Sequence, residues 1–206
     1  MLATPACSAA WGCRDDGADI PILSKPKPST RRCNKRLALW ARLYYRRNAP
    51  EVTIRAAVIS DIDCLLQLML GLQQDDSWSV PFREEVVRES LRELLVNPSV
   101  GRVFLIQESD SCVGYLVLSF DFSLEYGGKN AWVDELFIRP EFRGKGIGSK
   151  TLDFAVEAAR DCGAKVLHLE VNRGNPAIDL YRRHGFEDHN RSLLSKWLSR
   201  KNEENP

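Results

Sequence analysis

Hydrophobic residues recur with two different periods along residues 52–198, and the change of period separates predicted strands from predicted helices. Runs rich in β-branched and aromatic residues predict strands at residues 52–56, 103–107, 113–120, 131–138 and 165–171. Apolar residues spaced three or four apart predict helices at residues 61–74, 81–96, 147–162 and 176–183. Weak strand signals follow at residues 187–190 and 193–198. The order is β-α-α-β-β-β-α-β-α-β, with space for one more strand, and it predicts an α/β (α+β) fold.

The first 50 residues follow another pattern. Residues 1–34 mix Pro, Ser, Gly and charged residues with little periodicity, which predicts a disordered extension. Residues 35–47 place apolar residues on one stripe among many basic ones and predict a short helix. Such a helix can lie on an acidic membrane surface or partner, or it can be solvated or packed on the domain. We expect a basic extension at residues 1–50 and one folded domain at residues 51–206.

Charge is divided unevenly between these two parts. Residues 1–50 hold ten Lys and Arg against three Asp, although the whole chain has a formal net charge of only +1. The remaining residues hold 19 Lys and Arg against 25 Asp and Glu. An acidic domain argues against nucleic acid as a partner and suits a cationic substrate, and a solvated acidic surface would give the same balance.

Three further expectations concern the redox compartment, membrane spans and metal ligands. The six cysteines include no Cys-x-x-Cys pair, which favours a reducing compartment. No apolar stretch approaches the ~18 residues that a membrane span requires, and the N-terminus lacks the apolar core of a signal peptide. The three histidines show no ligand spacing. We therefore predict a cytoplasmic protein with no membrane span and no metal.

A glycine-rich turn joins the predicted strand at residues 131–138 to the helix that begins at Ile147. Residues 143–148 read Arg-Gly-Lys-Gly-Ile-Gly. The glycines let backbone N–H groups approach an anion, and the first helical turn adds unpaired donors and the positive end of its dipole. Arg143 and Lys145 add positive charge. The turn therefore predicts a site for a ligand that carries a pyrophosphate.

Two common phosphate-binding motifs do not fit this turn. A P-loop needs Gly-x-x-x-x-Gly-Lys followed by Ser or Thr, but Gly146 follows Lys145 and Arg139 stands at the position of the first glycine. A Rossmann turn needs a third glycine where Ser149 stands. It also belongs to a first βα unit and not to the end of an antiparallel meander.

Two motifs together resemble the GCN5-related N-acetyltransferase (GNAT) superfamily. Arg143, Gly146 and Gly148 match its Arg/Gln-x-x-Gly-x-Gly/Ala signature for acetyl-CoA. A second motif is matched by Ala177, Leu180, Tyr181, Gly185 and Phe186. The resemblance implies a GNAT fold with a mixed, mostly antiparallel sheet of six to seven strands and about four helices. It also implies acetyl-CoA as co-substrate and direct attack by an amine in a ternary complex.

The resemblance further implies where coenzyme A binds. The turn would hold the pyrophosphate, and the pantetheine arm would lie where the strands at 131–138 and 165–171 diverge. Backbone groups of Phe137 and Ile138 would pair with the arm, and the Ile138 amide would polarise the acetyl oxygen. Gly174 replaces the usual asparagine of the second motif, so two nearby asparagines become candidates. The candidate cofactor-binding residues are Phe137, Ile138, Arg139, Arg143, Gly144, Lys145, Gly146, Ile147, Gly148, Ser149, Asn172 and Asn175.

Acetyl transfer also needs a proton donor and a base. Tyr181 matches the tyrosine that protonates the departing thiolate in many of these transferases, and a thiol of pKa about 8.5 and a phenol near 10 make that transfer feasible. The candidate bases are Glu135, Asp134, Glu170 or a water relay. Strand alternation sends Asp134 and Glu135 to opposite faces, so at most one points at the acetyl group. Residues 134–137 resemble the Glu-Asp-Phe-Phe segment of diamine acetyltransferases, which favours Glu135 or Asp134, whereas Glu170 matches a base position of ribosomal-protein N-terminal acetyltransferases.

In this family the acceptor lies against the loop after the first helix and the segment before the fourth strand. These are residues 73–78 and 121–126 here, and both mix acidic with aromatic residues. Such a mixture suits a protonated amine. We expect a small-molecule primary amine or polyamine-like acceptor, then a protein N-terminus or lysine, then an aminoglycoside-type antibiotic. A non-catalytic acetyl-CoA-binding sensor is the alternative of another class, and a homodimer is possible by the same resemblance.

Overall fold

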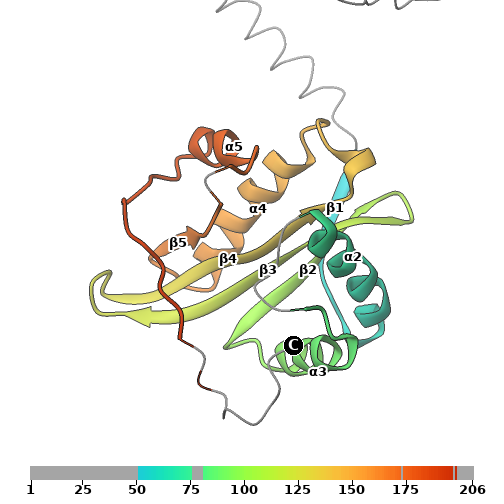
Figure 1. The fold of residues 1–206 in the computed structure, drawn as a ribbon, viewed down its shortest axis with the longest axis horizontal. Coiled ribbons are helices and arrows are strands. Elements are labelled where there is room, and N and C mark those ends of the chain that lie inside the picture. The colour runs from blue at the N-terminus through green and yellow to red at the C-terminus, as the bar shows by residue number, and fades with distance from the viewer. Residues whose placement is uncertain (1–50, 76–80, 173, 197, 199–206) are drawn as a thin grey trace, which may run out of the picture. The chain divides into compact units, whose positions relative to one another are not determined.

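A five-stranded sheet with the order β1-β2-β3-β4-β5 is the centre of the fold (Figure 1). The computed structural model describes residues 51–75, 81–172, 174–196 and 198. The strands are β1 (Val52–Ala56), β2 (Gly101–Glu108), β3 (Ser111–Ser123), β4 (Gly128–Ile138) and β5 (Val166–Leu169). The helices are η1 (Ile59–Asp61), α2 (Ile62–Asp75), α3 (Glu84–Val96), η2 (Pro140–Phe142), α4 (Ile147–Asp161) and α5 (Ile178–Arg183).

The predicted order of strands and helices is confirmed from residue 52 to residue 183, and so is the α/β class. The strand count differs, because the described residues form five strands instead of six or seven. The weak strand signals lay at residues 187–190 and 193–198, and the described residues there are exposed on every side. Without a buried face, no strand register is selected. The predicted extension at residues 1–50, with its possible helix, lies outside the described residues.

Strand directions follow from the connections. Short turns join β2 to β3 and β3 to β4, and these pairs are antiparallel, as is the β1–β2 pair. The chain then passes through α4 before β5, and a crossover of this kind returns the strand parallel to β4. None of the described helices is both long enough and apolar enough to cross a membrane.

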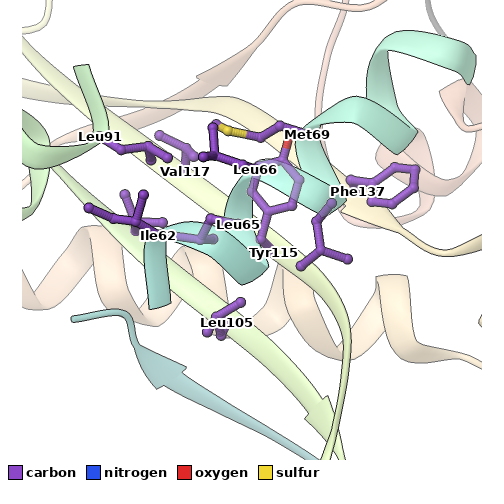
Figure 2. Packing of buried hydrophobic residues seen from close by; sticks show 11 residues of the cluster. Ile62, Leu65, Leu66, Met69, Leu91, Leu105, Tyr115, Val117 and Phe137 are labelled. Carbon is purple, nitrogen blue, oxygen red and sulfur yellow. The ribbon is translucent and has the colours of Figure 1, made fainter. Parts of the chain in front are cut away.

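Helices cover both faces of the sheet. On one face, α2 and α3 pack on a cluster of buried residues that includes Leu65, Leu66, Met69, Leu91, Leu105, Tyr115, Val117 and Phe137. Figure 2 shows the Tyr115 ring inside this cluster, near Leu66, Met69 and Phe137. On the other face, α4 packs on Leu116, Leu118 and Val133, and the rings of Phe104 and Phe154 meet edge to face at 4.9 Å. These clusters place the side chain of Phe137 on one side of β4 and those of Val133 and Leu136 on the other.

Two irregularities of β4 shape the surface that follows. The pairing register between β3 and β4 shifts between Val117 and Leu118, since Val117 pairs with Glu135 and Leu118 pairs with Val133. Asp134 is therefore the extra residue of a β-bulge. The parallel pairing with β5 is also short, because it covers only residues 130–133 of β4. Both irregularities occur at the same point of the strand.

Candidate active site

The edge of β4 beyond residue 133 is not paired with β5. Arg139 donates its N–H to the carbonyl oxygen of Val113 on β3 at 2.9 Å. Because backbone groups alternate in direction along a strand, the N–H and C=O groups of Leu136 and Ile138 face away from β3, toward this unpaired edge. The backbone of Phe137 faces β3 instead, where Tyr115 is its partner.

The predicted divergence of the two strands is thus present, and the structure adds Leu136 to the residues whose backbone faces it. Sequence patterns missed Leu136 because its side chain, which packs with the cluster below α4, says nothing about the direction of its amide. The pairing register of β3 with β4 is the signal that identifies it. An extended chain with amide groups, such as a pantetheine arm, fits an edge of this kind.

The glycine-rich turn has the backbone geometry of an anion site. Gly144 and Gly146 have φ values of 73° and 83°, in the region that favours glycine, and Gly146 caps the N-terminus of α4. The first helical bond outside the turn runs from the N–H of Lys150 to the oxygen of Gly146, at 3.1 Å. Among the described residues, no backbone carbonyl accepts from the N–H groups of residues 144–146. These amides are available for a pyrophosphate.

The two predicted cations of the turn have different surroundings. Arg143 donates from Nε to the carbonyl oxygen of Ile138 at 2.8 Å, and its Nη2 binds the carboxylate of Asp75 at the end of α2. Its guanidinium also lies 5.5 Å from the centroid of the Phe137 ring. The exposed Lys145 lies with its Nζ 4.8 Å from the Phe142 ring centroid. Arg143 is therefore engaged with protein groups.

The candidate base Glu135 lies half-buried on the face covered by α2. Its Oε2 accepts a hydrogen bond from the Tyr115 hydroxyl at 2.7 Å. Val133, two residues earlier, belongs to the cluster on the opposite face. The expectation that Asp134 and Glu135 point to opposite faces stays a prediction. Regular alternation would put Val133 and Glu135 on one face, but here they lie on opposite faces. The bulge at Asp134 is the reason.

Burial changes the proton affinity of both carboxylates. Desolvation raises the pKa of Glu135 to about 7, the nearby charge of Asp134 adds to this rise, and the hydrogen bond from Tyr115 opposes it. Desolvation also raises the pKa of Asp134, although its side chain keeps contact with solvent. Burial and the Glu135 charge raise the pKa of the Tyr115 phenol. A carboxylate that titrates near neutral pH is suited to general base catalysis.

Tyr181 and the two candidate asparagines lie on and before α5. The Tyr181 ring is half-buried and meets the Phe186 ring edge to face, with centroids 6.1 Å apart. Asn175 accepts with Oδ1 from the N–H of Ala177 at 2.8 Å, which forms an Asx turn just before α5. Its N–H donates to the carbonyl oxygen of Asn172 at 2.9 Å.

The remaining predicted cofactor residues lie on α4 or at the end of β4. Ile147 is buried beneath the turn, whereas Ser149 is half-buried in the first turn of α4. Gly148 faces α5: a Cβ atom there would lie 3.3 Å from Leu180. The close approach of α4 and α5 brings the turn and the second motif to the same side of the sheet, as Figure 1 shows.

A pocket of about 360 Å³ opens next to the bulge. Its lining combines three carboxylates with aromatic and apolar side chains: Ser119, Phe120, Asp121, Trp132, Val133, Asp134, Glu170 and Leu193. Trp132 donates from Nε1 to Asp121 at 3.1 Å, and its ring lies tilted against that of His168, with centroids 4.6 Å apart. The pocket therefore brings together two of the three candidate bases and the first residue of the predicted acceptor segment.

Of the two predicted acceptor segments, the structure describes residues 73–75 and 121–126. Residues 76–78 of the first acceptor loop lie outside the described residues. In the second segment, Glu125 forms an ion pair with Arg191 at 2.8 Å, and Tyr126 lies against His168. The sequence analysis did not identify Trp132 as a pocket residue. Its place two residues before the candidate base Asp134, on the same predicted strand, could have indicated it. Among the described residues, no group of three His, Cys, Asp or Glu side chains could hold a metal ion.

Comparisons with known proteins agree with this geometry. Residues 69–186 match the sequence profile described as the acetyltransferase (GNAT) family. Thialysine N-ε-acetyltransferase of Bos taurus is 39% identical over 151 residues, which are 66% of this chain and 85% of that protein. Aminoalkylphosphonate N-acetyltransferase of Salmonella typhimurium is 27% identical over 139 residues, which are 67% of this chain and 86% of that protein.

Solved structures give the same result for the fold. An integron cassette protein from a salt-marsh metagenome is 35% identical, with a TM-score of 0.63, and the match covers 71% of this chain and 91% of that one. A protein of Clostridium acetobutylicum, described as a predicted acetyltransferase with acetyl-CoA, has a TM-score of 0.61 at 17% identity. That match covers 70% of this chain and 96% of the other, and it supports the fold alone.

Proposed function

Because the chain belongs to the acetyltransferase (GNAT) family and is therefore an acyltransferase, we propose that it transfers the acetyl group of acetyl-CoA to a primary amine of a small molecule. One observation carries this proposal. The pocket with three carboxylates lies at the bulge where the unpaired edge of β4 begins. An amine bound in the pocket would thus meet a thioester held along that edge.

The donor site is built from backbone groups. The amides of residues 144–146 and the first turn of α4 bind the pyrophosphate, and the unpaired edge of β4 binds the pantetheine arm. The N–H groups of Leu136 and Ile138 are the two donors that can polarise the acetyl oxygen. Leu136 lies two residues from Asp134 and is therefore nearer to the pocket. One such donor is typically worth about 3 kcal/mol in the transition state.

Glu135 serves as the general base in this proposal. Its pKa of about 7 leaves it ionised from neutral pH upward, and in the chain it directly follows Asp134, which lines the pocket. An alkylammonium has a pKa of about 10, so the bound amine must lose a proton before or during attack. Glu135 takes this proton, directly or through a water, while Tyr181 gives a proton to the departing sulfur.

The three carboxylates of the pocket bind the positive charge of the acceptor. Asp121, Asp134 and Glu170 line a pocket whose wall also contains Trp132, and a cation between carboxylates and an indole gains both charge pairing and cation–π attraction. Bos taurus thialysine N-ε-acetyltransferase, named for a small amine substrate, supports the same class of acceptor. A diamine is expected to bind better than a monoamine, because its second ammonium group remains charged.

An amine panel tests the proposal. Purified protein is incubated with acetyl-CoA and monoamines, diamines, amino acids or peptides, and free thiol is measured. We expect release of coenzyme A with small primary amines, and the Glu170→Gln variant should raise KM for diamines more than KM for monoamines. Titration calorimetry that shows coenzyme A binding without thiol release for any amine would favour a sensor. Turnover with peptides alone would favour a protein acetyltransferase.

A further inference from the structure

Tyr115 has a polar group in a place where an apolar ring would be expected. The residue is completely buried in the cluster beneath α2. Figure 2 shows its ring near Leu66, Met69 and Phe137. A phenylalanine would fill the same volume without burying a hydroxyl group, which costs free energy unless it forms a hydrogen bond. The partner of the hydroxyl is therefore informative.

That partner is the candidate base. The Tyr115 hydroxyl lies 2.7 Å from Oε2 of Glu135, on the neighbouring strand. An ionised carboxylate can only accept, so the phenol must donate. The bond thus occupies one carboxylate oxygen and restricts the rotation of the side chain. The other oxygen, Oε1, remains to receive a proton.

The bulge makes this contact possible. Val133 lies in the cluster on the α4 face, whereas Glu135 pairs with Val117 on the α2 face. If Asp134 were a regular strand residue and not the extra residue of a bulge, alternation would put Glu135 on the same face as Val133, away from the phenol. The side chains of α2 that pack on Tyr115 are Leu65, Leu66 and Met69, which carry no charge.

We propose that Tyr115 is a positioning residue for the reaction: its hydroxyl holds one carboxylate oxygen of Glu135 and leaves the other to take the proton of the acceptor amine. This inference rests on the proposed function, because it assigns the base of that reaction. The bond also changes proton affinity. Donation from Tyr115 favours the ionised form of Glu135 and lowers its pKa, against the opposite effects of burial and of Asp134.

The Tyr115→Phe variant tests the proposal, since it removes only the hydroxyl group. The midpoint of the acid limb of kcat/KM for the amine should move up by about one pH unit, because a hydrogen bond to a charged group is worth roughly one to two pKa units. At pH 7 the rate should fall about tenfold or less from this shift, and KM for acetyl-CoA should stay within about twofold. In a Glu135→Gln background, Tyr115→Phe should cost no further activity.

Two controls distinguish a positioning role from a packing role. Val103→Ala truncates another buried residue of the same cluster and should lower thermal stability without moving the acid limb. An unchanged acid limb in Tyr115→Phe would overturn the proposal.

A second measurement needs no turnover: carbon-13 NMR can follow the titration of the Glu135 carboxyl group. The midpoint of this titration should rise in Tyr115→Phe, and an equal midpoint would also overturn the proposal. A wild-type protein that acetylates no amine would instead refute the proposed function, and the NMR titration would still decide whether Tyr115 controls Glu135.

Discussion

Arg143 binds Asp75 and so connects the turn before α4 to the C-terminal end of α2. The same guanidinium bonds to the carbonyl oxygen of Ile138 and lies over the ring of Phe137. One side chain therefore joins three parts of the proposed site: the pyrophosphate turn, the unpaired edge of β4 and the helix that leads into the first acceptor loop. Its contacts suggest an organising role in addition to the charge that it brings.

The Asp75→Asn variant separates these two roles. If Arg143 chiefly organises the site, the change should raise KM for the amine and leave the Kd for coenzyme A within about twofold. Stability should fall by only about 0.5 kcal/mol, because both side chains are partly exposed. Titration calorimetry and steady-state kinetics measure both effects. Tighter coenzyme A binding in the variant would mean that Asp75 had been neutralising a charge meant for the pyrophosphate.

Gly146→Ala is expected to weaken coenzyme A binding. An alanine at a φ of 83° costs about 1–2 kcal/mol, and the turn can relieve this strain only by moving the amides that face the anion. Gly163 is a matched control, because it has a φ of 78° at the other end of α4. Gly163→Ala should lower the melting temperature similarly and leave coenzyme A affinity unchanged. Equal affinities in both variants would argue against the turn as the pyrophosphate site.

The sequence predicted the frame of this site because its signals are local. The turn at residues 143–148 needs glycines at fixed positions, and Gly144 and Gly146 have the positive φ values that only glycine adopts readily. Helix and strand periods predicted the elements around it to within a few residues. The last strands were wrong because a weak local propensity at residues 187–198 was not supported by burial.

Contacts between residues far apart in the chain could not be predicted from the sequence. The position of Glu135 depends on a one-residue bulge, and nothing in the alternation of residues 131–138 shows where the extra residue lies. The Tyr115 contact depends on that bulge and on the register of β3 against β4. Arg143 was assigned to the phosphate from its charge and from its place in the glycine-rich motif, which are local signals, whereas its partner Asp75 is 68 residues away in the chain.

Tyr181→Phe should reduce kcat and leave both KM values nearly unchanged. The variant keeps the ring that packs against Phe186, so the fold of α5 should be retained. Loss of a general acid typically costs about 10²-fold or more in rate. Steady-state kinetics with acetyl-CoA and the best amine of the panel provide the measurement. An unchanged kcat would mean that another group, such as a water, protonates the thiolate or that chemistry is not rate-limiting, which a pre-steady-state burst would reveal.

Glu135→Gln should make the protein less active and more stable at alkaline pH. The folded pKa of Glu135 is about 7, above the ordinary value of 4.5, because burial disfavours its charge. Between these two values the folded state holds the proton more tightly than the unfolded state, so stability falls as pH rises from about 4.5 to 7. A neutral glutamine avoids this loss and can still accept the Tyr115 hydrogen bond. The variant should therefore equal the wild type near pH 4 and exceed it by about 3 kcal/mol at pH 8. Urea unfolding at four pH values measures the difference.

Val103→Ala is the control, because it should lower stability by the same amount at every pH. A Glu135→Gln difference that is equally constant would show that Glu135 does not titrate near neutral pH.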